Sequence, residues 1–466
     1  MTDPRYQEAI DYIYSFIDFS VERSYRYSAD TFKLDRVRAL LNALGNPQDS
    51  FKSIHIAGTK GKGSVSALIA SVLRAAGFGT GLYTSPHLQR LTERIQVNGQ
   101  EISTADIVRL VDAMRPHVDV IQELTVYEIL TALGFLYFAQ KGVEYAAVEV
   151  GLGGRLDATN VLTPLVSVIT SLSYDHMHLL GQSLSDIARE KAGIIKPSVP
   201  VVTAPQQHEA ERVVEQVAKS LESPLVRVGR DWLFLPGGHD LFGQNLYVWS
   251  ADEQPLMDAY VESAGGEEWA PPRYWIPLLG YHQVINGAVA YATIQVAKDR
   301  GLEVSEDAIQ EGFRLVSWPG RFQVLSRSPT VVVDSAHNRD SALKLRIALD
   351  DYFPGQPVTL IFGASADKDI SGMFAELIPR VSRLIVTKAK HPRAADPEEL
   401  ADLAHSHGLR VQVIATCAEA LDMALTKARP EEVILAAGSV FVVGEILAAW
   451  DEMNQSITTR KEEVAR

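Results

Sequence analysis

Short apolar runs alternate with longer amphipathic segments over most of the 466-residue chain. In the first half, runs rich in β-branched residues predict strands at residues 53–57, 145–150, 165–170 and 199–203. After Ser64, apolar residues recur at positions 65, 68, 69, 72 and 73, which is the spacing of one helix face, and Gly77 ends this helix. Strands that alternate with helices in this way predict a parallel sheet covered by helices.

The same alternation starts again late in the chain, where it predicts strands at residues 330–333, 358–362, 384–387, 411–414 and 433–436. We therefore expect an α/β fold with two domains: a larger P-loop, parallel-sheet domain over residues 1–316 and a smaller, Rossmann-like domain over residues 317–466. Residues 226–277 are rich in Trp, Tyr, Gly and Pro and lack a helical period, which predicts a hairpin insertion in the first domain. Pro319 and Gly320 predict a hinge.

Composition and charge narrow the class of protein. Hydrophobic residues make up 46% and charged residues 22% of the chain, as in a soluble globular protein. The formal net charge of −14 argues against nucleic-acid and membrane partners, so any anionic ligand needs a local pocket. The single cysteine, Cys417, excludes an intramolecular disulfide, and residues 1–10 lack the apolar core of a secretory signal. We expect a cytoplasmic protein.

A glycine-rich segment, residues 55–64 (His-Ile-Ala-Gly-Thr-Lys-Gly-Lys-Gly-Ser), lies between a predicted strand and a predicted helix. Such a loop brings peptide N–H groups onto phosphate oxygens, the helix N-terminus adds its positive end, and Lys62 reaches the β- and γ-phosphates. The segment departs from the strict P-loop pattern because Gly63 stands between Lys62 and Ser64. A glycine-rich turn without a ligand is the alternative. We assign ATP binding to Gly58, Thr59, Lys60, Gly61, Lys62, Gly63 and Ser64.

Two further side chains have the right type and position for phosphate chemistry. Glu149 ends an apolar strand, where nucleotide-binding sheets often offer a carboxylate to Mg²⁺. An ordinary strand-end acid in a turn is the equal alternative. Arg321 follows the predicted hinge and is suited to reach a γ-phosphate across the cleft between the domains. Its alternative is an interdomain salt bridge.

A series of motifs in fixed order resembles the folylpolyglutamate synthase and dihydrofolate synthase family, a branch of the Mur ligases. Besides the phosphate loop, the motifs are residues 84–88 (Thr-Ser-Pro-His-Leu), 93–95, 149–160, 190–194, 279–283, 319–322 and 334–338. The resemblance implies Mur ligase architecture. It also implies an ATP-dependent ligase that adds L-glutamate to folates and to dihydropteroate through an acyl phosphate, giving ADP and phosphate.

The resemblance also implies two Mg²⁺ ions and their ligands. Ser85 and Glu149 would bind the first ion, and His176 the second. Lys191 would react with CO₂ to form a carbamate, which inverts its charge and supplies an oxygen donor. A turn hydroxyl at Ser85, a hydrogen-bonding His176 and an exposed Lys191 are the alternatives.

In the same way, the resemblance places Asn286 near the adenine, Asp334 near the ribose and His337 near the nucleotide and the incoming glutamate. The expected catalytic residues are Lys62, Lys191, Arg321 and His337. The turn at residues 363–369 also resembles a family loop, without a role for each residue.

Residues 124–128 (Leu-Thr-Val-Tyr-Glu) resemble the pterin-side segment of the family, which usually has Phe at the position of Tyr127. The resemblance implies that Thr125 and Tyr127 contact the folate and that Asp157 and Ala158 border the same pocket. A helix start with Tyr127 in the core is the alternative. These motifs do not separate the two activities of the family.

Two other functions explain the motifs of the sequence less well. A Mur-type ligase acting on a cell-wall peptide precursor fits less well, because the Gly-Lys-Gly-Ser spacing and the Ser-Pro-His-Leu segment favour folate. A P-loop NTPase that drives a partner protein lacks the strict phosphate-loop spacing and does not explain the second domain. We expect a monomer whose partners are small molecules: reduced folate or dihydropteroate, L-glutamate and ATP.

Overall fold

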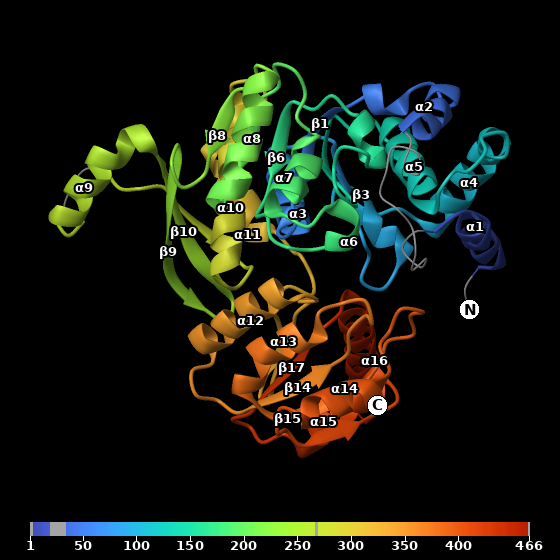
Figure 1. Cartoon of the computed structure of the whole chain (residues 1–466), viewed down its shortest axis with the longest axis vertical. Helices are drawn as coiled ribbons and strands as arrows, with labels where there is room; N and C mark the ends of the chain where they lie inside the picture. The colour runs from blue at the N-terminus through green and yellow to red at the C-terminus, as the bar shows by residue number, and fades with distance from the viewer. Residues whose placement is uncertain (1–2, 19–33, 266–268, 465–466) are drawn as a thin grey trace.

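The computed structural model of the chain describes residues 3–18, 34–265 and 269–464. Its strands form an eight-stranded, a three-stranded and a six-stranded sheet. The six-stranded sheet and its helices form the lower part of the molecule in Figure 1, and the other two sheets lie above it. The predicted α/β class, with a parallel-sheet first domain and a separate C-terminal α/β domain, is confirmed.

The eight-stranded sheet carries the predicted phosphate loop. The strands β2, β5, β1, β6, β7 and β8 run parallel, and β3 and β4 add an antiparallel edge. In spatial order the strands are β4 (Gln100–Glu101), β3 (Ile95–Val97), β2 (Thr80–Tyr83), β5 (Tyr145–Glu149), β1 (Lys52–Ala57), β6 (Val166–Ile169), β7 (Val201–Thr203) and β8 (Leu225–Arg227).

Helices cover both faces of this sheet because successive side chains of a strand point to opposite faces. Ile54 and Ile56 of β1 pack in one core with α3 (Lys62–Ala75), α10 (Tyr281–Lys298) and α11 (Glu306–Leu315). The helices of the opposite face are α1 (Pro4–Tyr14), α2 (Leu34–Ala43), α4 (Thr104–Val118) and α5 (Val126–Gln140), with α7 (Leu184–Ala192) and α8 (His208–Ser220) farther along the sheet.

The three-stranded antiparallel sheet comprises β9 (Trp232–Asp240), β10 (Gly243–Ser250) and β11 (Arg273–Ile276). The segment predicted as a hairpin contains the β9–β10 pair, but it also contains a helix, α9 (Gln254–Glu262), which our prediction lacked. This helix projects away from the rest of the molecule (Figure 1) and buries only Met257. Leu256, Met257, Tyr260 and Val261 have helical spacing, so the sequence carried a signal that the prediction missed. Val226, placed in the hairpin by the prediction, belongs to β8.

The six-stranded sheet is parallel except for β12 at its edge. Its strands in spatial order are β12 (Gln323–Arg327), β13 (Thr330–Val333), β17 (Val433–Ala437), β14 (Val358–Phe362), β15 (Val381–Val386) and β16 (Val411–Val413). One face packs on α12 (Arg339–Tyr352), α13 (Ile370–Leu377) and α14 (Pro397–His405), and the other on α15 (Cys417–Lys427) and α16 (Val440–Val464).

Loops from the two large sheets meet in a cleft. The loops after β1 and β6 carry Lys60 and Asp175, which contact His337 and Asn338 in the loop after β13. Near this junction, Gly320 adopts a positive φ of 71°, a conformation that favours glycine. Within the described residues, none of the helices combines the length and apolarity needed to cross a bilayer.

Candidate active site

The phosphate loop connects β1 to α3 and is shaped by glycines. Gly58 and Gly61 have positive φ angles of 150° and 93°. A Cβ atom on Gly58 would lie 1.8 Å from the Thr170 hydroxyl oxygen, and one on Gly61 would lie 2.3 Å from Oδ1 of Asn286. Only glycine fits at both positions, and the contact brings Asn286 of α10 beside the loop.

Some backbone N–H groups of this loop already have an acceptor within the protein, and others remain available for a ligand. Those of Thr59 and Lys60 donate to the carbonyl oxygen of Ser171 at 2.9 and 3.1 Å, so they already have an acceptor. The helix α3 begins at Lys62, and the first N–H groups of a helix have no acceptor within it. The helix start, with Lys62, Gly63 and Ser64, therefore offers the donors for an anion.

Lys62, at the start of α3, and Glu149, at the end of β5, face each other at the carboxyl edge of the sheet. The Lys62 ammonium nitrogen lies 3.8 Å from Oε1 of Glu149, and the N–H of Ser85 donates to Oε2 at 3.2 Å. Burial raises the pKa of Glu149, while the positive charge of Lys62 opposes the rise. The site thus holds a buried carboxyl group with two cationic neighbours, Lys62 and Arg321.

The loop that carries Ser85 is fixed by a residue to which we assigned no role. The Glu93 carboxylate accepts N–H hydrogen bonds from Leu88, Gln89 and Arg90 at 2.7, 3.1 and 2.9 Å. Three donors on one carboxylate hold residues 85–90 in a single arrangement. Glu93 belongs to one of the motifs of the sequence, but only the fold reveals this contact.

Asp175 is the main link between the two halves of the cleft, and the prediction gave it no role. Its Oδ2 accepts hydrogen bonds from the Lys60 ammonium at 3.1 Å and from the Asn338 amide at 2.9 Å, and its Oδ1 accepts one from Lys368 at 3.3 Å. Burial favours a higher pKa for Asp175, but the charges of Lys60, His176 and Lys368 outweigh it and hold the pKa well below its usual range.

His337 joins this cluster through Lys60. Its Nδ1 lies 2.8 Å from the Ser335 carbonyl oxygen, and its Nε2 lies 3.0 Å from the Lys60 ammonium nitrogen. A ring that donates from Nδ1 and accepts at Nε2 is neutral. The charge of Lys60 and burial both lower the pKa of His337 well below its usual value, in agreement with that tautomer.

His176 and Lys191 lie close to the phosphate loop and to Asp175, and Nε2 of His176 is 3.8 Å from Oδ1 of Asp175. His176 has a positive φ of 49° and precedes the short helix α6 (Met177–Leu180). Lys191 is buried in α7, not exposed, and its ammonium donates to the Gly58 carbonyl oxygen at 2.8 Å. Burial and the nearby charge of Lys62 lower the pKa of Lys191 to about 7.

Arg321 and Asp334 lie in the same region of the cleft, after the segment predicted as a hinge. Burial lowers the pKa of Arg321, against the opposing charges of Asp334 and Glu149. Among the described residues, no carboxylate lies within 4.0 Å of the Arg321 guanidinium, so the interdomain salt bridge is not formed there. The Asp334 carboxylate accepts N–H hydrogen bonds from Phe322 at 2.7 Å and from Ala336 at 2.8 Å, and it thereby shapes the turn beside Arg321.

The predicted folate residues gather beside Ser85 and Glu149. Thr125 caps α5: its hydroxyl accepts the N–H of Glu128 at 3.2 Å, and the Glu128 carboxylate accepts the N–H of Thr125 at 2.8 Å. The Tyr127 ring lies against Gly151, where an added Cβ would approach the ring to 2.6 Å. The buried Tyr127 hydroxyl makes no hydrogen bond of normal length and angle among the described residues, although Ser85 and Tyr83 lie near it.

Asp157 and Ala158 lie at the start of a short 3-10 helix, η3 (Ala158–Val161), and both are buried. One Asp157 oxygen accepts the N–H groups of Gly151 and Leu152, each at 3.0 Å. The other accepts from Thr159. In this structure Asp157 therefore organises the glycine-rich loop that follows Glu149.

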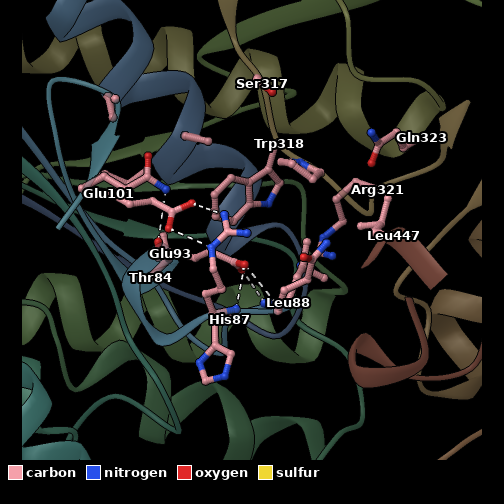
Figure 2. Close-up of a pocket in the computed structure, with 18 of the residues that line it drawn as sticks. Thr84, His87, Leu88, Glu93, Glu101, Ser317, Trp318, Arg321, Gln323 and Leu447 are labelled. Atoms are coloured by element: carbon pink, nitrogen blue, oxygen red, sulfur yellow. Dashed lines mark hydrogen bonds and ion pairs between the residues drawn. The ribbon is translucent and has the colours of Figure 1, made fainter. Parts of the chain in front are cut away.

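A groove of about 600 Å³ opens between the two large sheets on the α3 side, and Thr125, Tyr127, Asp157 and Ala158 do not line it. Figure 2 shows residues from both halves around it, including His87 and Leu88 from the loop after β2 and Trp318 and Arg321 from the hinge segment. Trp318 also lies against the start of α3, since a Cβ on Gly63 would come within 2.7 Å of its ring. The groove is large enough for a small-molecule substrate and is shared by both halves of the molecule.

The donor set is suited to a hard cation. The described part of the chain contains no group of three His, Cys, Asp or Glu side chains placed to hold a metal ion by themselves. Mg²⁺ does not need one, because it keeps several waters and binds phosphate oxygens alongside one or two protein carboxylates. The buried Glu149 carboxylate beside the phosphate loop fits that requirement.

Comparisons with known proteins agree with this architecture. Residues 56–294 match the Mur ligase middle domain, and residues 320–440 match the Mur ligase glutamate ligase domain. The chain is 34% identical over 448 residues to the folylpolyglutamate synthase of Lacticaseibacillus casei, covering 95% of this chain and 97% of that protein. It is 32% identical over 448 residues to the dihydrofolate synthase/folylpolyglutamate synthase of Bacillus subtilis, covering 95% and 98%. The structure of Escherichia coli FolC in complex with DHPP and ADP superposes with a TM-score of 0.82 and 30% identity, over 97% of this chain and 99% of that one.

Proposed function

Since the chain belongs to the folylpolyglutamate synthase and dihydrofolate synthase family of Mur ligases, we propose that it joins L-glutamate both to reduced folates and to dihydropteroate. It is a ligase that forms carbon–nitrogen bonds with ATP. The observation that carries the proposal for the site is the meeting of the phosphate loop, Glu149 and the second-domain loop around His337 in one cleft.

The reaction needs activation of a carboxylate, because joining a carboxylate to an amine is uphill in water. Transfer of the γ-phosphoryl group of ATP to the folate carboxylate gives an acyl phosphate and ADP. The amine of glutamate then attacks the acyl carbon, and phosphate leaves. A cleft that closes around this intermediate protects it from hydrolysis, which is a reason for two domains to contribute to the site.

The cationic side chains of the cleft suit the transferring phosphoryl group. We assign the phosphates to Lys62 and the first N–H groups of α3, and the adenine to the vicinity of Asn286. Arg321 would neutralise charge on the phosphoryl group from the opposite side of the cleft. His337 would line the path of the incoming glutamate. Its neutral ring, bonded to Lys60, supports a role in orientation.

We propose two Mg²⁺ ions in this site. Glu149 and Ser85 would hold the first, and His176 with a carbamate on Lys191 would hold the second. The ions would supply positive charge that stabilises the phosphoryl group during transfer. The lowered pKa of the buried Lys191, about 7, supports the carbamate, because only a neutral amine reacts with CO₂.

For the acceptor we propose a pocket formed by Thr125, Tyr127, Asp157 and Ala158. The Tyr127 hydroxyl supports a ligand there, because it makes no hydrogen bond of normal length and angle among the described residues and a buried hydroxyl normally has a partner. Thr125 and Asp157 would act mainly by shaping the pocket, since their side-chain oxygens already accept backbone N–H groups.

We further propose that the protein acts as a monomer in the cytoplasm, on small-molecule substrates alone. The single cysteine is buried and its pKa is raised, chiefly by burial, so it is unsuited to intermolecular disulfides. Light scattering coupled to size-exclusion chromatography tests the oligomeric state.

One assay tests the function. The protein is incubated with MgATP, glutamate and either dihydropteroate or tetrahydrofolate, and phosphate release and product mass are followed. We expect phosphate release that requires both the acceptor and glutamate, with a product heavier by one glutamyl residue. Phosphate release that is independent of both substrates would support the NTPase instead. Turnover of only one acceptor would remove the bifunctional part of the proposal.

A further inference from the structure

A buried histidine outside the expected catalytic set lies at the centre of the large sheet. His55 belongs to β1, between β5 and β6, and its exposed fraction is 0%. Its neighbours Ile54 and Ile56 point into the core beneath α3, so His55 points to the opposite face of the sheet. A polar ring buried in this position needs a reason, because burying an imidazole without a partner is unfavourable.

The hydrogen-bond partner of His55 is Thr159. The other hydrogen bond of the Thr159 hydroxyl determines which of the two residues donates. The His55 Nε2 atom lies 2.8 Å from the Thr159 hydroxyl oxygen. That hydroxyl has one proton, which it donates to Oδ1 of Asp157 at 2.5 Å. The hydroxyl oxygen must therefore accept, and the Nε2–H of His55 must donate. The ring is neutral, and its other nitrogen, Nδ1, has no partner among the described residues.

The hydrogen bonds continue from Asp157 to the loop beside the acceptor pocket. The other oxygen of Asp157 holds the N–H groups of Gly151 and Leu152, two and three residues after Glu149. Gly151 in turn lies against the ring of Tyr127. His55 is thus connected, through two side chains, to the position of the loop that borders the proposed pocket.

We propose that His55 is a positioning residue for the acceptor: it fixes the Thr159 hydroxyl, and thereby Asp157 and the loop at residues 151–157, against Tyr127. The inference rests on the proposed function in one respect, the assignment of the acceptor to this pocket. Among the described residues, the His55 ring bonds to Thr159 and makes no hydrogen bond to Lys60 or Lys62, so its loss should act on the acceptor and leave ATP binding unchanged.

The variants follow from the hydrogen-bond directions. His55→Leu removes the donor, Thr159→Val removes the hydroxyl while keeping the shape, and His55→Gln retains an N–H donor. Ser167→Ala is the matched control, because Ser167 is buried, pairs in register with His55 on β6, and donates instead to the Ile194 carbonyl oxygen. The steady-state constants for acceptor, glutamate and ATP are measured separately for each variant.

We expect His55→Leu to lower kcat/KM for the acceptor by about tenfold, the effect of one lost hydrogen bond of about 1.4 kcal/mol. Thr159→Val should lower it by at least as much, because the Thr159 hydroxyl makes two hydrogen bonds. The KM for ATP should stay within about twofold of the wild type. The kcat/KM of the double variant for the acceptor should be no lower than that of the less active single variant, because both changes break the same chain of hydrogen bonds. His55→Gln should recover most of the loss, and Ser167→Ala should show none.

Hydrogen–deuterium exchange tests the same inference without turnover. Exchange at residues 151–157 should accelerate in His55→Leu and Thr159→Val and stay at the wild-type rate in Ser167→Ala. Equal losses for all three substrates, or unchanged exchange in this loop, would overturn the positioning role. A wild-type protein that turns over neither acceptor would refute the proposed function instead, and the exchange experiment would still decide whether His55 fixes the loop. If His55→Leu does not fold, Thr159→Val and His55→Gln carry both measurements.

Discussion

The Lys60 ammonium nitrogen lies 3.0 Å from Nε2 of His337, although 277 positions separate the two residues in the chain. Lys60 comes from the phosphate loop and His337 from the loop after β13, so the contact joins the two large sheets at the site of the proposed chemistry. Asp175 completes the junction, because it accepts hydrogen bonds from Lys60 and from Lys368 of the C-terminal sheet.

Substitution of Asp175 should loosen this junction. In Asp175→Asn, Lys60 and Lys368 lose the negative charge between them. Breaking a buried pair in this way is expected to lower the free energy of unfolding by about 2–4 kcal/mol. We also expect kcat to fall by about tenfold or more, because the two halves of the cleft are no longer held in register. Urea unfolding, steady-state kinetics and limited proteolysis at the hinge measure these effects.

Glu376→Gln is the control for that experiment. Glu376 pairs with Arg339 and Arg346 within the C-terminal domain, so its loss should lower stability without changing kcat or hinge proteolysis. If Asp175→Asn behaved like Glu376→Gln, Asp175 would have no role beyond local stability.

The pair formed by Lys62 and Glu149 should be indispensable for turnover. We expect Lys62→Ala and Glu149→Ala each to lower kcat by about 100-fold or more, as is typical when a charged group at a phosphoryl-transfer site is lost. The circular dichroism spectrum should be unchanged. Glu144→Ala, which alters an acid just before β5 at the other end of the strand, should retain activity. Wild-type rates in either site variant would disprove the assignment of this edge of the sheet.

The buried amine of Lys191 leads to a pH-dependent prediction. Because its pKa is lowered to about 7, the amine is mostly neutral at pH 8 and mostly protonated at pH 6. At an equal concentration of dissolved CO₂, enzyme depleted of CO₂ should therefore regain activity faster at pH 8 than at pH 6. Lys191→Ala should stay inactive with bicarbonate, and Arg189→Ala, on the exposed side of the same helix, should respond like the wild type. Intact mass under mild conditions detects the added CO₂, and a plain amine in fully active enzyme would contradict the carbamate.

The Tyr127 hydroxyl offers a test of acceptor choice. Since it makes no hydrogen bond of normal length and angle among the described residues, Tyr127→Phe should leave thermal stability unchanged. If the hydroxyl contacts the acceptor, its loss should change kcat/KM for dihydropteroate relative to tetrahydrofolate by about two- to tenfold, without affecting the KM for ATP. Tyr137→Phe, on the same helix, is the control. If the ratio of kcat/KM for the two acceptors is unchanged, the Tyr127 hydroxyl does not contact the acceptor and the ring serves only for packing.

The sequence predicted the central strands better than the edges. Residues 330–333 and 358–362 were predicted to the residue, because strands buried on both faces are continuous apolar runs. The four-residue strand β2 was not predicted, although all its residues are buried. The short edge strands β3 and β4 were not predicted either. They contain few residues and are half exposed, so their composition does not differ from that of a loop.

The residues of the candidate site also differ in how well the sequence predicts them. The phosphate loop and Glu149 were recognisable because their local sequence carries the chemistry. Asp175 and Lys368 were not, since their contact joins loops 193 positions apart and leaves no local pattern. The cap formed by Thr125 and Glu128 could have been recognised, because Thr followed three residues later by Glu before an apolar run marks a helix start.

The stability of the protein in acid should report the burial of His55. Burial and the charge of Lys196 lower the pKa of His55 in the folded protein to about 3, from 6.5. Above pH 6.5 the ring is neutral in both states and no penalty arises. Below that pH, His55 binds a proton in the unfolded chain but stays neutral in the folded protein. The free energy of unfolding therefore falls by about 1.4 kcal/mol per pH unit down to about pH 3.

His55→Gln cannot titrate, so it lacks this particular loss. We therefore expect the stability gap between the wild type and His55→Gln to shrink by about 2 kcal/mol between pH 7 and pH 5, as measured by urea unfolding. The gap between the wild type and Ser167→Ala should stay constant over the same range, because serine does not titrate. A constant gap for His55→Gln would mean that the buried ring takes up its proton as readily as a solvated one, and the neutral donor on which the contact with Thr159 depends would be lost.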